Sequence, residues 1–145
     1  TLQEQGITLE KLSYQFANWN RGQAENKMTQ LIHHYGDEIE LVLSNNDEMA
    51  MGAVAAYEAS GYPKEKRPVI FGIDGLDSAL DAIQNDLIQG TVYNDRAGQA
   101  EQISRLAMDL FQGKEPEGYD FENERYIFLP YQKVTAANVE EFLHR

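Results

Sequence analysis

Polar side chains follow four segments that the sequence predicts as strands. The first is followed by "NWN" at 18–20, the second by "NND" at 45–47, the third by "DG" at 74–75 and the fourth by "ND" at 94–95. A carboxylate accepts several hydrogen bonds, and a primary amide both donates and accepts. This combination suits vicinal hydroxyl groups, and an indole face can pack flat against the C–H face of a pyranose ring. The pattern therefore predicts a polyol-binding edge.

Four residues carry this hypothesis: Trp19, Asn46, Asp74 and Asn94. Each also has a simpler explanation, because Asn or Asp after a strand commonly caps the next helix and Trp is usually largely buried. At the second strand end we expect Asp47 to cap the helix and Asn46 to point into a cleft. Their joint occurrence at one predicted edge favours ligand binding.

The elements that must position these residues alternate along the chain. Period-two alternation predicts a strand at 11–17, and short apolar runs predict strands at 39–43, 67–74 and 90–94. Helices are predicted at 23–35, 48–60, 76–84, 97–112 and 135–143, the last capped by Thr135, and 125–131 is predicted to be extended. Such alternation indicates right-handed βαβ units and a mostly parallel sheet. The carboxyl ends of parallel strands share one edge, where ligands bind in open α/β sheets.

Composition and charge narrow the class of protein. Of 145 residues, 42% are hydrophobic and 25% are charged, which is typical of a globular chain. The net charge of −12 argues against a nucleic-acid partner, because a phosphate backbone repels an acidic surface. Cysteine is absent, which excludes disulfides and thiol nucleophiles. No nucleophile or general-base motif indicates an enzyme, and adjacent His33 and His34 would not share a helix face for a metal.

Four stretches identify a family resemblance: "NNDEMAMGAVAA", "VIFGIDGLDSAL", "GTVYND" and "FLPYQKV". Together they resemble the galactose/glucose-binding proteins, which are type I periplasmic sugar-binding proteins. The resemblance runs along the whole chain but covers only the C-terminal half of a family member. It implies an α/β fold with a three-layer parallel sheet flanked by helices. It also implies that Trp19 packs on one face of a pyranose and that Asn46, Asp74 and Asn94 bind its hydroxyls.

Glu40 is similar to the family's separate calcium-binding glutamate. The other ligands of that calcium come from a loop that this chain does not contain. Because calcium takes six to eight oxygen ligands, we expect no cofactor in this chain, and calcium only in a full-length protein.

The family's chain path also implies a division of the chain. Residues 1–93 and 131–145 are expected to form the C-terminal lobe, while 94–130 cross the hinge and belong to an N-terminal lobe. The helix predicted within 97–129 has lost its usual partner in this chain. We therefore expect this segment to self-associate or to fold back on its own lobe.

The resulting prediction is a non-enzymatic binding protein for a hexose of the galactose/glucose class. Its expected partners are the sugar, the N-terminal lobe, the permease of an ABC importer and, in some bacteria, a chemoreceptor. The expected location is periplasmic or extracellular, with or without a lipid anchor. The alternative is the effector-binding domain of a sugar-responsive transcription regulator, which shares this fold.

Overall fold

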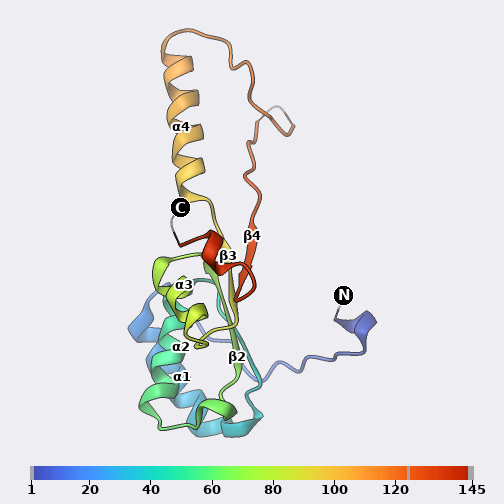
Figure 1. Ribbon diagram of the computed structural model, residues 1–145, viewed down its shortest axis with the longest axis vertical. Helices are drawn as coiled ribbons and strands as arrows, with labels where there is room; N and C mark the ends of the chain where they lie inside the picture. The colour runs from blue at the N-terminus through green and yellow to red at the C-terminus, as the bar shows by residue number, and fades with distance from the viewer. Residues whose placement is uncertain (1, 124, 144–145) are drawn as a thin grey trace.

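A four-stranded sheet organises the structure, a computed structural model that describes residues 2–123 and 125–143 (Figure 1). Its spatial order is β1-β2-β3-β4. The strands are β1 (Leu41–Leu43), β2 (Val69–Asp74), β3 (Gly90–Tyr93) and β4 (Gln132–Thr135). The first three are parallel, and β4 pairs antiparallel with β3. The predicted α/β class and mostly parallel sheet are therefore confirmed.

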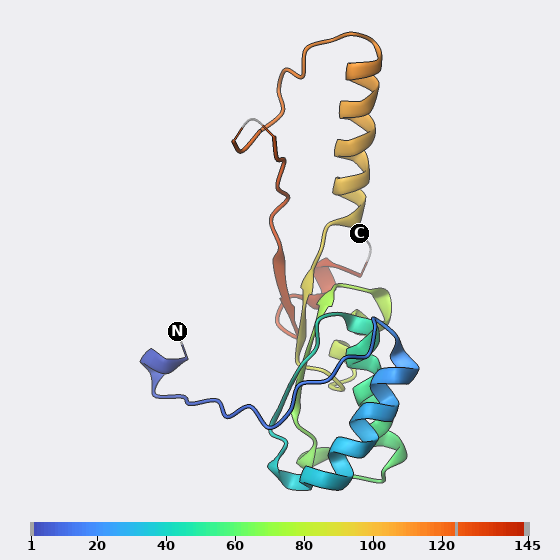
Figure 2. The same ribbon diagram turned by 180° about the vertical axis from the view of Figure 1, so that it is seen from behind.

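Three helices lie on one side of this sheet, as Figures 1 and 2 show. They are α1 (Arg21–Tyr35), α2 (Asp47–Ala59) and α3 (Asp77–Gln84). α2 and α3 connect parallel strands and cover the sheet, because right-handed crossovers that step across a sheet in one direction place successive helices on one face. α1 packs against α2. On the opposite face Leu43 is 68% exposed and Val69 is 40% exposed. The described residues thus form the sheet and a helical layer on one of its faces. They do not form the helical layer that the predicted three-layer arrangement places on the other face.

The core lies between these helices and the sheet. Its largest fully buried apolar side chains are Tyr57, Ile70, Leu80, Ile88 and Val134. Short 3-10 helices, η1 (Gln3–Gln5), η2 (Gly36–Glu38), η3 (Lys64–Lys66) and η4 (Val139–Glu141), complete the regular structure. Among the described residues, no helix is long and apolar enough to cross a bilayer.

Helices α1 and α2 approach each other closely at Gly52. A Cβ atom at this position would overlap the carbonyl oxygen of Arg21 and would lie 2.8 Å from the Cβ of Ala24. The first turn of α1 therefore lies directly against α2, and this contact requires glycine.

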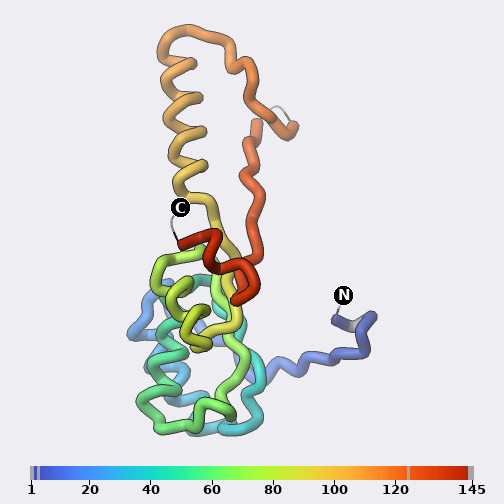
Figure 3. The backbone as a smooth tube through the Cα atoms, in the orientation of Figure 1, coloured from blue at the N-terminus to red at the C-terminus, as the bar shows by residue number. Residues whose placement is uncertain are grey.

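An arm projects from the lobe between β3 and β4, as Figure 3 shows. It consists of α4 (Arg96–Phe111) and a return segment whose described residues, 112–123 and 125–131, are largely irregular. No residue of α4 is buried, and Phe111 is 86% exposed. The arm does not fold back on the lobe, so that alternative is wrong for this structure. Self-association through 97–129, and the assignment of 94–130 to a separate lobe, stay predictions.

The strand predicted at 11–17 is wrong. These residues are extended, but no ladder joins them to β1 or to any other described strand. Leu12 is half-buried and its carbonyl accepts a hydrogen bond from the Tyr35 hydroxyl at 3.0 Å. Tyr14 and Phe16 are exposed. Their rings contact each other, with centroids 5.1 Å apart, and neither ring pairs with another aromatic ring among the described residues. Alternation therefore identified an extended segment, but a strand also needs a pairing partner.

The helix predicted at 135–143 is also largely wrong. Residues up to Thr135 belong to β4, and only the short η4 follows. The backbone N–H of Thr135 donates to Asn138 Oδ1 at 2.9 Å. The Asn138 side chain therefore closes the turn, and Thr135 does not act as a helix cap.

Candidate functional site

Three of the four predicted site residues lie at the carboxyl edge of the sheet. Asp74 ends β2, while Asn46 and Asn94 follow β1 and β3 within three residues. The Asn94 N–H donates to the Asp74 carbonyl at 3.1 Å, so these two strand ends are joined directly. The parallel pairing of β1, β2 and β3 brings the three polar side chains to one edge, as their spacing predicted.

Trp19 occupies the turn that leads into α1. Figure 2 shows the chain entering α1 at the end of the lobe where α2 also begins. Asn20 caps α1, since its Oδ1 accepts from the Gln23 N–H at 2.9 Å. The close contact at Gly52 fixes this first turn against α2. The indole therefore lies at the same end of the lobe as the three polar residues.

The backbone holds this indole outside the core. Asn18 and Trp19 both have left-handed conformations, with φ angles of 50° and 58°. A bulky residue rarely adopts this conformation, which costs free energy and is found mainly at turns and functional sites. Trp19 is 65% exposed. The simpler explanation of a buried packing Trp therefore does not apply.

The helix cap at the second strand end is Asn46 and not Asp47. Asn46 is the N-cap of α2, and its Oδ1 accepts from the Met49 N–H at 2.9 Å. Asp47 is completely buried. The prediction that Asp47 caps the helix is wrong, because its carboxylate turns inward to the sheet. Asn46 is itself only 8% exposed, and because the cap uses its oxygen, its amide nitrogen is the group left to donate to a ligand.

The buried Asp47 carboxylate binds groups from two neighbouring elements. Its Oδ1 accepts from the Thr91 hydroxyl of β3 at 2.7 Å, and its Oδ2 accepts from the Leu76 N–H at 2.8 Å. Burial raises the pKa of Asp47 although these hydrogen bonds favour the charged form. A Cβ at Gly72 would overlap Oδ1, so glycine on β2 makes room for the carboxylate. Sequence reasoning missed this network because Asp47 looked like an ordinary cap.

Asp74 and Asn94 present complementary groups. Asp74 is partly exposed with a φ of 120°, and burial raises the pKa of its carboxyl group. Asn94 Oδ1 accepts from Gln99 Nε2 of α4, which leaves the Asn94 amide nitrogen as its donor toward a ligand. Gln99 was not among the residues that the sequence predicted for the site. The edge thus combines a carboxylate acceptor with two amide donors, a set that suits neighbouring hydroxyl groups.

Glu40 does not lie at the carboxyl edge with Asn46, Asp74 and Asn94. It is exposed, precedes β1, and its carbonyl accepts from the Val69 N–H at 3.0 Å. Within residues 2–123 and 125–143, no group of three or more His, Asp or Glu side chains could hold a metal ion. The calcium role of Glu40 stays a prediction.

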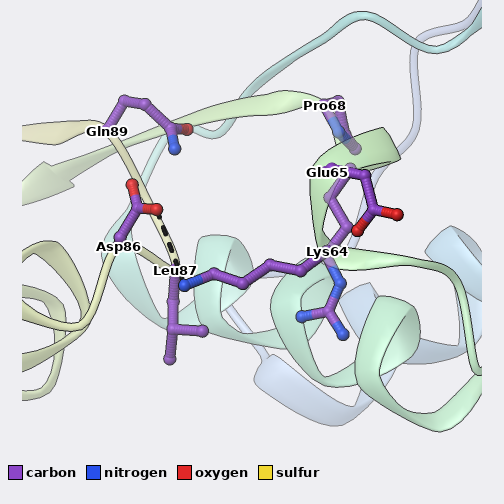
Figure 4. Close-up of a pocket in the computed structure, with 7 residues that line it drawn as sticks. Lys64, Glu65, Pro68, Asp86, Leu87 and Gln89 are labelled. Atoms are coloured by element: carbon purple, nitrogen blue, oxygen red, sulfur yellow. Dashed lines mark ion pairs between the residues drawn. The ribbon is translucent and has the colours of Figure 1, made fainter.

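A hollow of about 350 Å³ lies at the opposite edge of the sheet, where Pro68 and Gln89 precede β2 and β3 (Figure 4). Lys64 Nζ reaches across it to Asp86 Oδ2 at 3.5 Å. Both charged side chains are largely exposed, so this contact contributes little to stability. The hollow contains none of the predicted site residues.

Comparison with known proteins agrees with the fold and the motifs. Residues 1–115 match the family model described as "Periplasmic binding protein domain". The chain is 36% identical over 98% of its length to a D-galactose/methyl-galactoside binding periplasmic protein of Haemophilus influenzae, and covers 43% of that protein. It is 35% identical over 86% of its length to a xylitol-binding protein of Mycolicibacterium smegmatis, and covers 33% of that protein.

A solved structure shows the same fold. An ABC transporter solute binding protein from Bacillus halodurans, with bound myo-inositol, superposes with a TM-score of 0.79 at 32% identity. The alignment covers 93% of this chain and 43% of that protein. The chain thus spans less than half the length of the relatives it matches. The resemblance is confirmed, and because the matched residues exceed half of the chain, this chain belongs to the periplasmic binding protein domain family, a family of solute-binding proteins and not of enzymes.

Proposed function

We propose that this chain supplies one side of a saccharide clamp in a solute-binding protein that delivers a hexose of the galactose/glucose class to an ABC importer. The observation that carries this proposal is the exposed indole of Trp19, held by left-handed backbone at the end of the lobe that also bears Asn46, Asp74 and Asn94. An apolar face at the same end of the lobe as one acceptor and two donors suits a sugar ring with its hydroxyls.

The family and its relatives support a periplasmic or extracellular location for the whole protein. The relatives bind different polyols by name, including D-galactose and xylitol, and one structure contains myo-inositol. The preference for a hexose rests on the area of the Trp19 indole, which suits a six-membered ring with an extended C–H face. A permease and a chemoreceptor are proposed partners of the whole protein, and a lipid anchor is a proposed means of attachment.

The affinity of this chain alone should be low. Millimolar binding corresponds to about 4 kcal/mol and micromolar binding to about 8 kcal/mol. Three polar contacts on an open, wet edge contribute at the lower end of about 1.5–3 kcal/mol each, and association itself has an entropic cost. We therefore expect millimolar dissociation constants for this chain, and micromolar constants when an opposing lobe closes over the sugar.

Titration of this chain with D-galactose, D-glucose, ribose, xylitol and myo-inositol tests the proposal. Trp19 is the chain's single tryptophan, so its fluorescence reports on the site directly. Amide shifts in an NMR titration should identify residues 46, 74 and 94 as the contact region. A fusion that places the N-terminal half of the Haemophilus relative before Thr1 supplies the opposing lobe.

Matched variants separate the site from the rest of the surface. Trp19→Ala and Asp74→Asn should weaken binding at least tenfold, whereas Phe111→Ala on the arm and Asp81→Asn on α3 should leave it unchanged. If no sugar in the panel changes Trp19 fluorescence or the three amide signals, in the chain or in the fusion, the proposed function is wrong.

A further inference from the structure

The peptide unit after Asp74 is held on both sides by hydrogen bonds. Its carbonyl accepts from the Asn94 N–H at 3.1 Å. Its N–H, which belongs to Gly75, donates to the Thr91 hydroxyl oxygen at 3.3 Å. The next N–H, that of Leu76, donates to Asp47 at 2.8 Å. The orientation of this turn is therefore set by a hydroxyl and a carboxylate beneath the edge.

Thr91 links the two halves of this arrangement. Its buried hydroxyl accepts from Gly75 and at the same time donates to Asp47 Oδ1 at 2.7 Å. A hydroxyl group can do both, whereas a methyl group can do neither. Asp47 accepts the hydrogen bonds from both Thr91 and Leu76, so a side-chain amide in its place would lose one of the two acceptors.

These bonds support a strained residue. The φ of 120° at Asp74 lies in a region that residues with side chains rarely adopt and that persists only when the surroundings enforce it. Gly75 follows with a φ of 73°, and a Cβ there would lie 2.5 Å from Tyr93 Cδ2. The chain therefore reverses sharply under Asp74 and leaves its carboxylate partly exposed at the edge.

We propose that Thr91 and Asp47 are positioning residues for sugar binding: they fix the Asp74–Gly75 turn, and through it the direction in which the Asp74 carboxylate meets a hydroxyl of the ligand. Both residues lie beneath the edge, with Asp47 0% and Thr91 2% exposed, and their polar side-chain groups are used within the protein. The inference rests on the proposed function for the ligand, but its geometric part concerns the unliganded chain and can be tested separately.

The first test needs no sugar and no substitution. In the unaltered chain, the Gly75 and Leu76 amides should exchange with solvent as slowly as amides within β2. A φ of 120° gives a small coupling between the amide and α protons of Asp74, whereas ordinary extended backbone gives a large one. Fast exchange of both amides, or a large coupling at Asp74, would overturn the proposal whatever the chain binds.

The second test compares Thr91→Val, which removes the hydroxyl at nearly constant shape, with Thr91→Ser, which keeps it. Thr91→Val should speed exchange at Gly75 and raise the Asp74 coupling, and Thr91→Ser should restore both toward wild-type values. Far-UV circular dichroism establishes that each variant is folded. If Thr91→Val does not fold, the exchange and coupling measurements on the unaltered chain still decide the geometric claim.

The third test asks whether Thr91 acts through Asp74. D-Galactose binding is measured by NMR titration for Thr91→Val alone, for Asp74→Ala alone and for the double variant. Thr91→Val should weaken binding about fivefold in the wild-type background and less than twofold in the Asp74→Ala background. An equal loss in both backgrounds would show that Thr91 does not act through Asp74 and would overturn the positioning role. Absence of all sugar binding with the predicted exchange and coupling would instead count against the proposed function alone.

Discussion

Replacing Gly52 by Ala should destabilise the protein, although helix propensity alone predicts the opposite. Gly52 lies in the interior of α2 and Gly22 is the second residue of α1, so the two positions differ in what faces them and Gly22 gains less from helix propensity. In an exposed helix, Ala is more favourable than Gly by about 1 kcal/mol. A Cβ at Gly22 would find its nearest atom, Asn20 Oδ1, at 3.6 Å, which is ordinary contact. Gly22→Ala should therefore raise the free energy of unfolding by up to about 1 kcal/mol.

At Gly52 the same methyl group meets the neighbouring helix. It would overlap the Arg21 carbonyl oxygen, and it would lie 2.8 Å from Ala24 Cβ and 3.0 Å from the Glu25 nitrogen. Carbon atoms in contact normally lie about 3.5–4.0 Å apart, so α1 would have to move by about 1 Å. Overpacking costs typically about 1–3 kcal/mol, and backbone atoms cannot rotate away, which favours the upper end. After the propensity gain, Gly52→Ala should lose about 2 kcal/mol.

Urea unfolding followed by far-UV circular dichroism measures both variants. The two unfolding free energies should differ by about 3 kcal/mol and lie on opposite sides of the wild-type value, a large effect for a domain whose stability is about 5–15 kcal/mol. The emission of Trp19 should also change in Gly52→Ala, because the turn that bears the indole is attached to the displaced helix. A Gly52→Ala protein at least as stable as wild type, with an unchanged denaturant slope, would refute the close-contact argument.

Three further outcomes are expected. Tyr57→Phe should raise the free energy of unfolding by up to about 1 kcal/mol in urea unfolding. Among the described residues, the Tyr57 hydroxyl is the buried side-chain polar atom without a hydrogen-bond partner, and burial raises its pKa to about 12. The control Tyr62→Phe loses a hydrogen bond to Asp37 and should not be stabilising. Burial raises the pKa of Asp47 in the folded state, so the folded protein binds this proton more tightly than the unfolded chain. The Asp47 contribution to stability should therefore be fully present below the unfolded pKa and fall as pH rises through the folded pKa. Carbon-13 NMR titration of the Asp47 carboxyl should give a pKa above 3.8, and a lower value would contradict the burial argument. Replacing residues 95–131 by one glycine should leave a cooperatively folding lobe. Tyr93 pairs with Gln132 across β3 and β4, and Asn94 followed by the new glycine gives the Asn-Gly pair that suits a two-residue hairpin turn. Loss of the cooperative urea transition would show that the arm supports the lobe.

Local patterns in the sequence were sufficient for most of the regular elements. Apolar periodicity predicted α1, α2, α3 and α4, and apolar runs predicted β1, β2 and β3, because each pattern is a property of a single element. The pattern of α4 predicted a helix correctly although none of its residues is buried in this structure. The same reasoning predicted a strand at 11–17 and missed β4. Whether an extended segment becomes a strand depends on a partner distant in the sequence, and alternation carries no information about that partner.

The sequence by itself determined the polar residue types at the ends of β1, β2 and β3, and parallel pairing then requires that they meet at one edge. Only the tertiary structure decided which of the two adjacent side chains at 46–47 caps the helix and which turns toward the sheet. Asn46 satisfies the helix end, while Asp47 finds Thr91 of β3 and room above Gly72 of β2, groups that lie far from it along the chain. Tertiary structure likewise decided that Trp19 is exposed and that Asp74 is strained, because both conformations are imposed by neighbours that no local pattern records.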